Sequence, residues 1–139
     1  MSLEKEDRNS LIDFRLEKSD NAMQDVELLV ANNRWPAAAN RLYYAAYYAV
    51  SSLMIASRIE AKTHEGIIRM FSKEFVMTER IDTRFGRIYN DLYTKRITGD
   101  YGDSFDVTEE DVQPMLIPTK ELISCVKEQI EIIRNKSNN

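Results

Sequence analysis

Hydrophobic residues recur at helical spacing along most of the chain, and most densely between Pro36 and Arg58. Alanine and leucine are strong helix formers, and Pro36 suits a first helical turn, where no backbone donor is lost. Two neighbouring stripes of this segment are apolar, formed by Ala45, Ala49, Leu53 and Ala56 and by Leu42, Ala46, Val50 and Met54. A helix that is apolar over so much of its circumference belongs in a protein interior. The uncharged stretch Leu42–Ala56 is shorter than the ~20 residues that span a bilayer, so we expect a core helix rather than a membrane helix.

Four other segments carry apolar residues three and four positions apart, which is the spacing of one helical face. They cover about residues 11–32, 63–75, 82–97 and 108–134. Thr63 and Thr108 precede two of them and are suitable N-terminal caps. Turn-forming residues at 99–103 are expected to end the fourth helix. Pro118 is expected to kink the last helix or to delay its regular part. The pattern predicts an all-α protein.

The composition favours a globular protein. Of 139 residues, 43% are hydrophobic and 30% are charged, which suits a single domain over residues 1–139 with frayed ends at 1–10 and 135–139. The net charge of −4 gives no general reason to bind nucleic acid. The first residues are charged and lack the apolar segment of a signal peptide. Cys125 is the single cysteine, which excludes an internal disulfide, and a reduced core thiol suits the cytoplasm, where we expect the protein.

Three stretches of the sequence resemble those of HEPN domains (higher eukaryotes and prokaryotes nucleotide-binding). They are Asn-Arg-Leu-Tyr-Tyr-Ala-Ala-Tyr-Tyr-Ala-Val at 40–50, Thr-His-Glu-Gly at 63–66 and Arg-Ile-Thr-Gly-Asp-Tyr at 96–101. The first and last together are fairly specific for the family, and the similarity runs from about Leu11 to Ile133. The resemblance implies an up-and-down bundle of four to five helices that forms a homodimer.

The resemblance also implies a biological setting. HEPN proteins are often partners of small nucleotidyltransferases in toxin–antitoxin pairs, and several are metal-independent ribonucleases. We therefore expect an RNA- or nucleotide-binding module of a toxin–antitoxin or defence system, with a nucleotidyltransferase as the candidate partner protein. Two alternatives stay open, which are a metal-independent ribonuclease toxin and a structural dimerisation or scaffold domain. We expect no metal, cofactor or membrane to be involved.

The sequence departs from the nuclease version of the family at one position. That version carries an arginine, four to six residues and then a histidine, but the positions that follow Arg96 at this spacing hold Tyr101, Gly102 and Asp103. Cleavage of RNA without a metal needs a group that accepts the 2′-hydroxyl proton, and imidazole is suited to this near neutral pH. Exposed aspartates, with a reference pKa of ~3.9, are weak bases. We therefore expect no nuclease activity by the usual route; a nuclease would have to use Arg96 with Asp100 or His64.

The candidate RNA- or nucleotide-binding residues come from three parts of the chain: Arg41, Tyr44, Tyr48, Arg84, Arg87, Arg96, Asp100 and Tyr101. Arg41, Tyr44 and Tyr48 share one face of the central helix. Arg96 could bind a phosphate through its planar guanidinium. We expect these two regions to meet and to form one polar notch. Tyr101 could accept a modification from a nucleotidyltransferase, as the resemblance implies.

Each of these candidates also has a structural interpretation. Arg96 could neutralise the helix C-terminus and pair with Asp100 or Asp103. Arg84 and Arg87 could belong to a solvated helix face paired with nearby acids, rather than to a stripe that binds phosphates. A single histidine such as His64 is most often structural. The sequence alone leaves both interpretations open.

Overall fold

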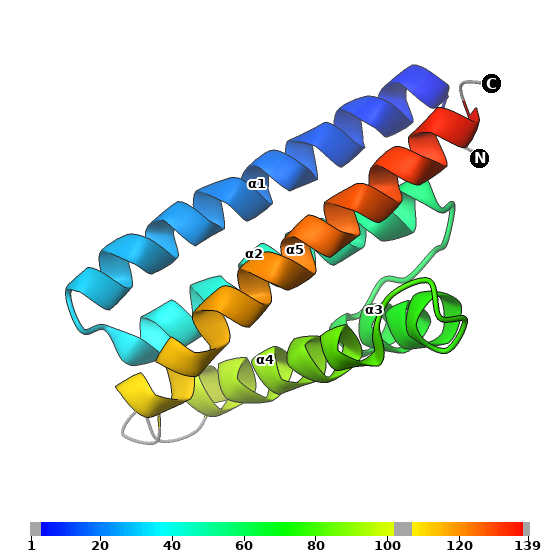
Figure 1. The fold of residues 1–139 in the computed structure, drawn as a ribbon. Coiled ribbons are helices and arrows are strands. Elements are labelled where there is room, and N and C mark those ends of the chain that lie inside the picture. Colours follow the sequence, from blue (N-terminus) through cyan, green and yellow to red (C-terminus); the bar gives the residue numbers. More distant parts are fainter. Residues whose placement is uncertain (1–3, 102–106, 138–139) are drawn as a thin grey trace.

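Helix α2 (Trp35–Ala56) lies at the centre of the computed structural model, which describes residues 4–101 and 107–137. It packs against α1 (Lys5–Ala31), α3 (His64–Phe71), α4 (Thr83–Tyr101) and α5 (Glu109–Ser137). A π-helical turn, η1 (Ser72–Val76), follows α3. Every regular element in these described residues is helical, so the predicted all-α bundle of four to five helices is confirmed. Figure 1 shows α5 crossing in front of α2, with α1 above them and α3 and α4 below.

Small residues allow α1 to approach α2 closely. Ala45, Ala46 and Ala49 are completely buried. The buried hydroxyl of Ser19 on α1 donates to the carbonyl of Ala45 at 2.6 Å. Because burying a hydroxyl without a partner is costly, this bond fixes the contact between the two helices. The predicted core position of the central helix is thus confirmed. In the described part of the chain, no helix has both the length and the apolar character needed to cross a membrane.

Two predicted helix caps are present. The Thr63 hydroxyl accepts the backbone N–H of Gly66 at 2.9 Å, and α3 follows directly. A β-carbon added to Gly66 would lie 2.9 Å from that same hydroxyl oxygen, so this position leaves no room for a side chain. At the start of α5, the backbone N–H of Thr108 donates to Asp111 at 2.9 Å, which is the reciprocal half of a capping box.

The predicted helix ends need correction at three places. Helix α1 begins at Lys5 rather than near residue 11. Helix α4 continues through Gly99 and Asp100 to Tyr101, because a helical glycine costs only about 1 kcal/mol and does not stop a helix by itself. Helix α5 is continuous through Pro118, so its regular part is not delayed. The buried residues Val112 and Leu122 anchor α5 on both sides of this proline, and their packing outweighs its local cost.

Candidate functional site

Two arginines from distant parts of the sequence meet on one tyrosine ring. The Arg96 guanidinium donates from Nη2 to the Tyr44 hydroxyl at 3.1 Å, and its centre lies 5.5 Å from the centre of the Tyr44 ring. The Arg41 guanidinium lies 5.0 Å from the centre of the same ring. Contact between α2 and α4 produces this arrangement. The structure therefore brings Arg41, Tyr44 and Arg96 together.

His64 joins these residues from the first turn of α3. Its Nδ1 lies 2.6 Å from the Tyr43 hydroxyl. The His64 ring centre is 5.9 Å from that of Tyr44 and 4.7 Å from that of Tyr47. Arg96 also lies 5.8 Å from the Tyr43 ring centre, so the imidazole and the guanidinium share the same two tyrosine neighbours. We call Arg41, Tyr43, Tyr44, His64 and Arg96 the arginine–tyrosine cluster.

The surroundings of His64 favour its neutral form. Burial is the largest cause that lowers the pKa of His64 below 6.5, and the positive charge of Arg96 lowers it further. The negative charge of Glu65 acts in the opposite direction. Burial also raises the pKa of Tyr43 far above its usual value, so its hydroxyl stays protonated. At neutral pH, His64 and Tyr43 are therefore a neutral imidazole and a neutral phenol. The tautomer of His64 decides which of the two donates the hydrogen bond between them.

Further aromatic and acidic residues hold the arginine–tyrosine cluster in position. Tyr89 of α4 is completely buried and stacks on Tyr43, with ring centres 6.0 Å apart and planes 11° apart. One turn later on α4, the Tyr93 hydroxyl donates to Glu65, which connects α4 to α3. This hydrogen bond is the largest cause that lowers the pKa of Glu65. Tyr43, Tyr89 and Tyr93 were not among the residues predicted for the site; for Tyr89 and Tyr93, the spacing of four residues along α4 was the available signal.

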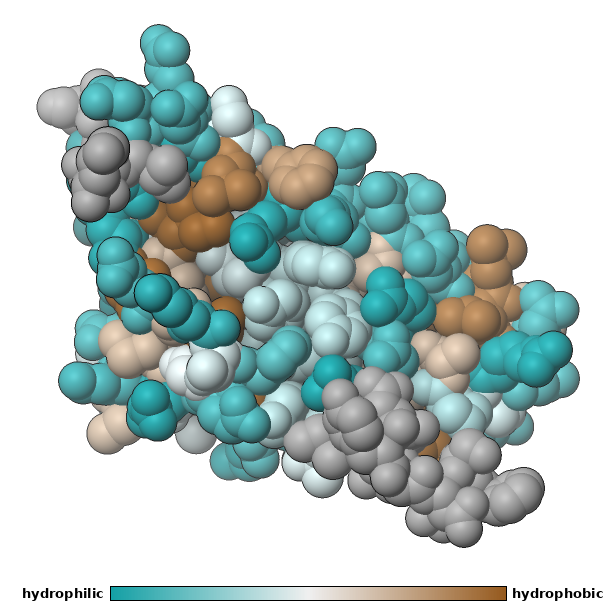
Figure 2. Space-filling view, turned by 180° about the vertical axis from the view of Figure 1, so that it is seen from behind, coloured by the Kyte–Doolittle hydropathy of each residue, from teal (hydrophilic) through white to brown (hydrophobic). Residues whose placement is uncertain are grey.

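Tyr48 lies at the edge of the arginine–tyrosine cluster. Its ring centre is 5.9 Å from that of Tyr44, and the Lys18 ammonium lies 5.2 Å from the Tyr48 ring centre. Tyr48 and Arg41 line a hollow of about 290 Å³ together with Phe14 and Lys18 of α1. Figure 2 shows the face seen from behind; its centre is of intermediate hydropathy, and both hydrophilic side chains and hydrophobic patches border it. Tyr44 and Tyr48 are both half-buried, and Tyr44 contacts Arg96 while Tyr48 lies on the other side of Tyr44, so the two rings extend an aromatic surface away from Arg96.

Arg84 and Arg87 lie at the other end of α4. At 1.5 Å of rise per residue they are roughly 18 and 14 Å from Arg96 along the helix axis. Arg84 pairs with Glu121 at 3.4 Å and its side chain is 54% exposed. Arg87 is exposed. The structure does not bring these two arginines into the arginine–tyrosine cluster.

The remaining candidates follow Arg96 in the sequence. Asp100 and Tyr101 form the end of α4, about one helical turn after Arg96, and the structure describes their backbone only. Asp103 lies outside the described residues. Within residues 4–101 and 107–137, no three His, Cys, Asp or Glu side chains lie close enough together to hold a metal ion. Cys125 is a free thiol whose pKa is raised chiefly by burial.

Comparison with known proteins identifies the family. Residues 12–129 match the HEPN domain. The chain belongs to the HEPN domain family. The resemblance seen in the tyrosine-rich helix and in the Thr-His-Glu-Gly and Gly-Asp-Tyr motifs is therefore confirmed.

Relatives of this HEPN domain are found in bacteria and archaea. A "UPF0332 protein" of Thermotoga maritima is 30% identical over 128 residues, which cover 92% of this chain and 97% of the relative. "Putative toxin MJ0142" of Methanocaldococcus jannaschii is 30% identical over 101 residues, or 73% of this chain and 69% of the relative. The crystal structure of TT1696 from Thermus thermophilus superposes with a TM-score of 0.73 at 15% identity. The superposition covers 85% of this chain and 97% of TT1696. At this level of identity, it supports the fold alone.

Proposed function

We propose that this HEPN domain binds RNA or a nucleotide through phosphate oxygens held by Arg41 and Arg96, as a module of a toxin–antitoxin or related defence system. The observation that carries the proposal is the meeting of the two guanidinium groups on the Tyr44 ring, 5.0 and 5.5 Å from its centre. Two cations against the same ring repel each other, and a bound anion would relieve this repulsion. The planar guanidinium matches a phosphate group with two parallel hydrogen bonds.

The charge on Arg41 supports this proposal in particular. Its Nε donates to the neutral side-chain oxygen of Asn40 at 3.0 Å. In the part of the chain that the structure describes, no carboxylate forms an ion pair with Arg41. An anion from outside the protein would complete its environment. The half-buried rings of Tyr44, Tyr47 and Tyr48 offer aromatic surface on which unpaired RNA bases could stack.

The names of the relatives support the proposed role in a toxin–antitoxin or defence system, but they do not bear on RNA or a nucleotide as the ligand. One of the archaeal relatives carries the name "Putative toxin MJ0142" and a second the name "Putative toxin MJ0605". The second is 25% identical over 118 residues, which cover 85% of this chain and 87% of the relative. The proposal includes a cytoplasmic homodimer and a nucleotidyltransferase as partner protein. Tyr101 remains the candidate acceptor of a modification by that partner.

Binding of a fluorescent single-stranded RNA, followed by anisotropy, tests the proposal. We expect Arg41→Gln and Arg96→Gln each to weaken binding about tenfold or more, because each removes charged hydrogen bonds to phosphate. Arg84→Gln is the matched control, since it removes the same charge from the same helix but outside the arginine–tyrosine cluster. Arg96→Lys should fall between these results, because lysine keeps the charge and loses the planar fork. Equal weakening by Arg84→Gln and Arg96→Gln would contradict the proposal.

The position of His64 favours a second function, which is metal-independent RNA cleavage. A neutral imidazole that shares its tyrosine neighbours with Arg96 combines a proton acceptor with a group that can stabilise negative charge on phosphate. In this reaction the 2′-oxygen would bond to phosphorus as His64 takes its proton. The bond from phosphorus to the 5′-oxygen would break, and water would protonate the leaving oxygen. The product would be a 2′,3′-cyclic phosphate.

Incubation with RNA in a chelating buffer separates cleavage from binding. If the protein is a ribonuclease, His64→Gln should abolish cleavage while it leaves RNA affinity nearly unchanged, and Arg96→Ala should reduce both. If the protein without substitutions forms no cyclic-phosphate products, the nuclease proposal is wrong, and the binding proposal is unaffected.

A further inference from the structure

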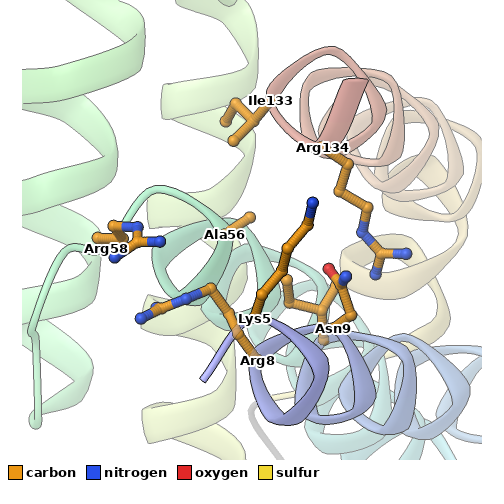
Figure 3. Close-up of a pocket in the computed structure, with 8 residues that line it drawn as sticks. Lys5, Arg8, Asn9, Ala56, Arg58, Ile133 and Arg134 are labelled. Atoms are coloured by element: carbon orange, nitrogen blue, oxygen red, sulfur yellow. The ribbon is translucent and has the colours of Figure 1, made fainter. Parts of the chain in front are cut away.

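A second basic region lies at the opposite end of the bundle, where the start of α1 and the ends of α2 and α5 meet. It surrounds a cavity of about 170 Å³, which we call the terminal cavity. Four cationic side chains line it together with the Asn9 amide: Lys5, Arg8, Arg58 and Arg134. Figure 3 shows Arg8 extending toward Arg58, while Lys5 extends toward the α5 residues Ile133 and Arg134. No carboxylate is among the lining residues that the structure describes.

The partners of these cations leave positive charge in the terminal cavity. Arg134 is neutralised by Asp13, with Nη2 and Oδ1 2.6 Å apart, and Arg8 donates to the carbonyl of Ile55 at 3.0 Å. Among the described residues, Lys5 and Arg58 form neither an ion pair nor a side-chain hydrogen bond. The acids at the start of α1 are exposed and do not line the cavity: Glu4, Glu6 and Asp7. Among the described residues that line the terminal cavity, the side chains are therefore cationic or neutral and none is anionic.

The backbone of Arg58 provides an independent observation. This residue has a φ of 59°, in the left-handed region, just after the end of α2. The backbone N–H of Ile59 donates to the carbonyl of Met54 at 2.9 Å, which is the bond of a helix-ending turn that usually contains glycine. A side chain at such a position costs free energy that glycine would avoid. An arginine at this strained position is explained if its guanidinium has a ligand.

We infer that the terminal cavity binds a phosphate group, either as free inorganic phosphate or as the terminal phosphates of a nucleotide. Guanidinium, ammonium and amide N–H groups from α1, from α5 and from the turn after α2 suit a small anion with several oxygen acceptors. The volume of about 170 Å³ is below the roughly 300 Å³ at which pockets begin to enclose drug-sized ligands. It accommodates phosphate groups and leaves a nucleoside outside. Along α2 the terminal cavity is roughly 18 Å from Tyr44, so it is separate from the arginine–tyrosine cluster.

Thermal melting in phosphate and in chloride of equal ionic strength tests this inference, with titration calorimetry of inorganic phosphate and of ATP as the direct measurement. We expect phosphate to raise the melting temperature above that in chloride, because a ligand that binds the folded state stabilises it. Lys5→Gln and Arg58→Gly should each weaken phosphate binding about tenfold or more. Binding of inorganic phosphate would identify the free ion as sufficient, and binding of ATP alone would identify the phosphates of a nucleotide.

Arg58→Gly makes the test specific, because its two effects have opposite signs. Glycine accepts a φ of 59° without strain, so this variant should melt higher than the unmodified protein in chloride and lose most of the phosphate-induced rise. Glu79→Gly is the matched control, since Glu79 also has a left-handed backbone, with a φ of 63°, away from the terminal cavity. It should keep the rise.

Lys120→Gln controls for net charge and should keep the rise with phosphate. Arg96→Gln separates the two sites, because it removes a guanidinium of the arginine–tyrosine cluster and leaves the terminal cavity unchanged. No phosphate-specific rise in the unmodified protein would overturn the inference. It would also be overturned by a full rise in both Lys5→Gln and Arg58→Gly. Loss of the rise in Arg96→Gln alone would assign the phosphate to the arginine–tyrosine cluster instead. None of these results depends on whether the domain binds RNA.

Discussion

The two ends of α4 carry arginines in very different surroundings. Near its start, Arg84 has a 54% exposed side chain and forms a surface ion pair with Glu121. Near its end, Arg96 is half-buried, bonds to the Tyr44 hydroxyl and lies against two tyrosine rings. The number of basic residues on a helix therefore says little about where a phosphate would bind. Burial, aromatic support and a second cation distinguish the Arg96 end from the Arg84 end.

The largest effect should come from removing the aromatic support at the Arg96 end. Tyr43 is completely buried, so Tyr43→Ala should lower the free energy of unfolding by about 3–5 kcal/mol, as for other large-to-small core changes. Urea denaturation measures this loss. Tyr43→Phe, which keeps the ring and removes only the contact to His64, should cost about 1 kcal/mol. If Tyr43→Ala costs no more than Tyr43→Phe, the ring does not support the arginine–tyrosine cluster.

A direct comparison of the two arginines should give a smaller difference. Arg96→Ala removes a hydrogen bond and two half-buried cation–π contacts, and we expect it to cost about 1–2 kcal/mol. Arg84→Ala removes an exposed ion pair, which is worth about 0.2–1 kcal/mol and less at high salt. Urea denaturation at low and high salt measures both. Equal costs, with equal dependence on salt, would show that the two ends do not differ energetically.

The smallest effect should be a dependence of stability on pH at the Arg96 end. The pKa of His64 is lowered from 6.5 in the folded protein, so the unfolded chain binds more protons as the pH falls below that value. The free energy of unfolding should therefore decrease from neutral toward acid pH, and this decrease should stop below the folded pKa. More than about one pH unit above 6.5 the histidine should contribute no pH dependence, because it is then neutral in both states.

Melting temperatures at a series of values between roughly pH 5 and 8 measure this dependence. His64→Gln should remove it, since the chain contains a single histidine. A variant that keeps the same slope in this range would assign the effect to other groups.

The sequence predicted the helices better than their ends. Hydrophobic spacing was sufficient for five helical segments, and local chemistry was sufficient for the Thr63 and Thr108 caps. Helix α4 does end within the predicted segment 99–103, at Tyr101, but this is four residues later than the expected end near residue 97, because helix continuation through Gly99 costs little. Of the kink or delay expected at Pro118, the delay does not occur, because packing of α5 on α2 overrides a local preference that sequence reasoning treats in isolation.

The candidate site was only partly accessible from the sequence. Helical spacing put Arg41, Tyr44 and Tyr48 on one face, and the structure brings Arg96 to that face. The contact between His64 and Tyr43 joins residues 21 positions apart, and it depends on how α3 packs against α2. No local pattern encodes that packing. Arg84 looked similar to Arg96 in the sequence because ion pairing with Glu121, 37 positions away, was not visible there.

The close fit at the start of α3 has a consequence for the histidine that follows Thr63. Because a β-carbon on Gly66 would come within 2.9 Å of the Thr63 hydroxyl, even an alanine there would push the capping oxygen out of place. Loss of this cap would weaken the first turn of α3, which begins with His64, and we expect the contact of 2.6 Å between the imidazole Nδ1 and the Tyr43 hydroxyl to lengthen. The orientation of the single imidazole in this protein, that of His64, therefore depends on Gly66, two residues away. Gly66 has no side chain and thus no reactive group of its own.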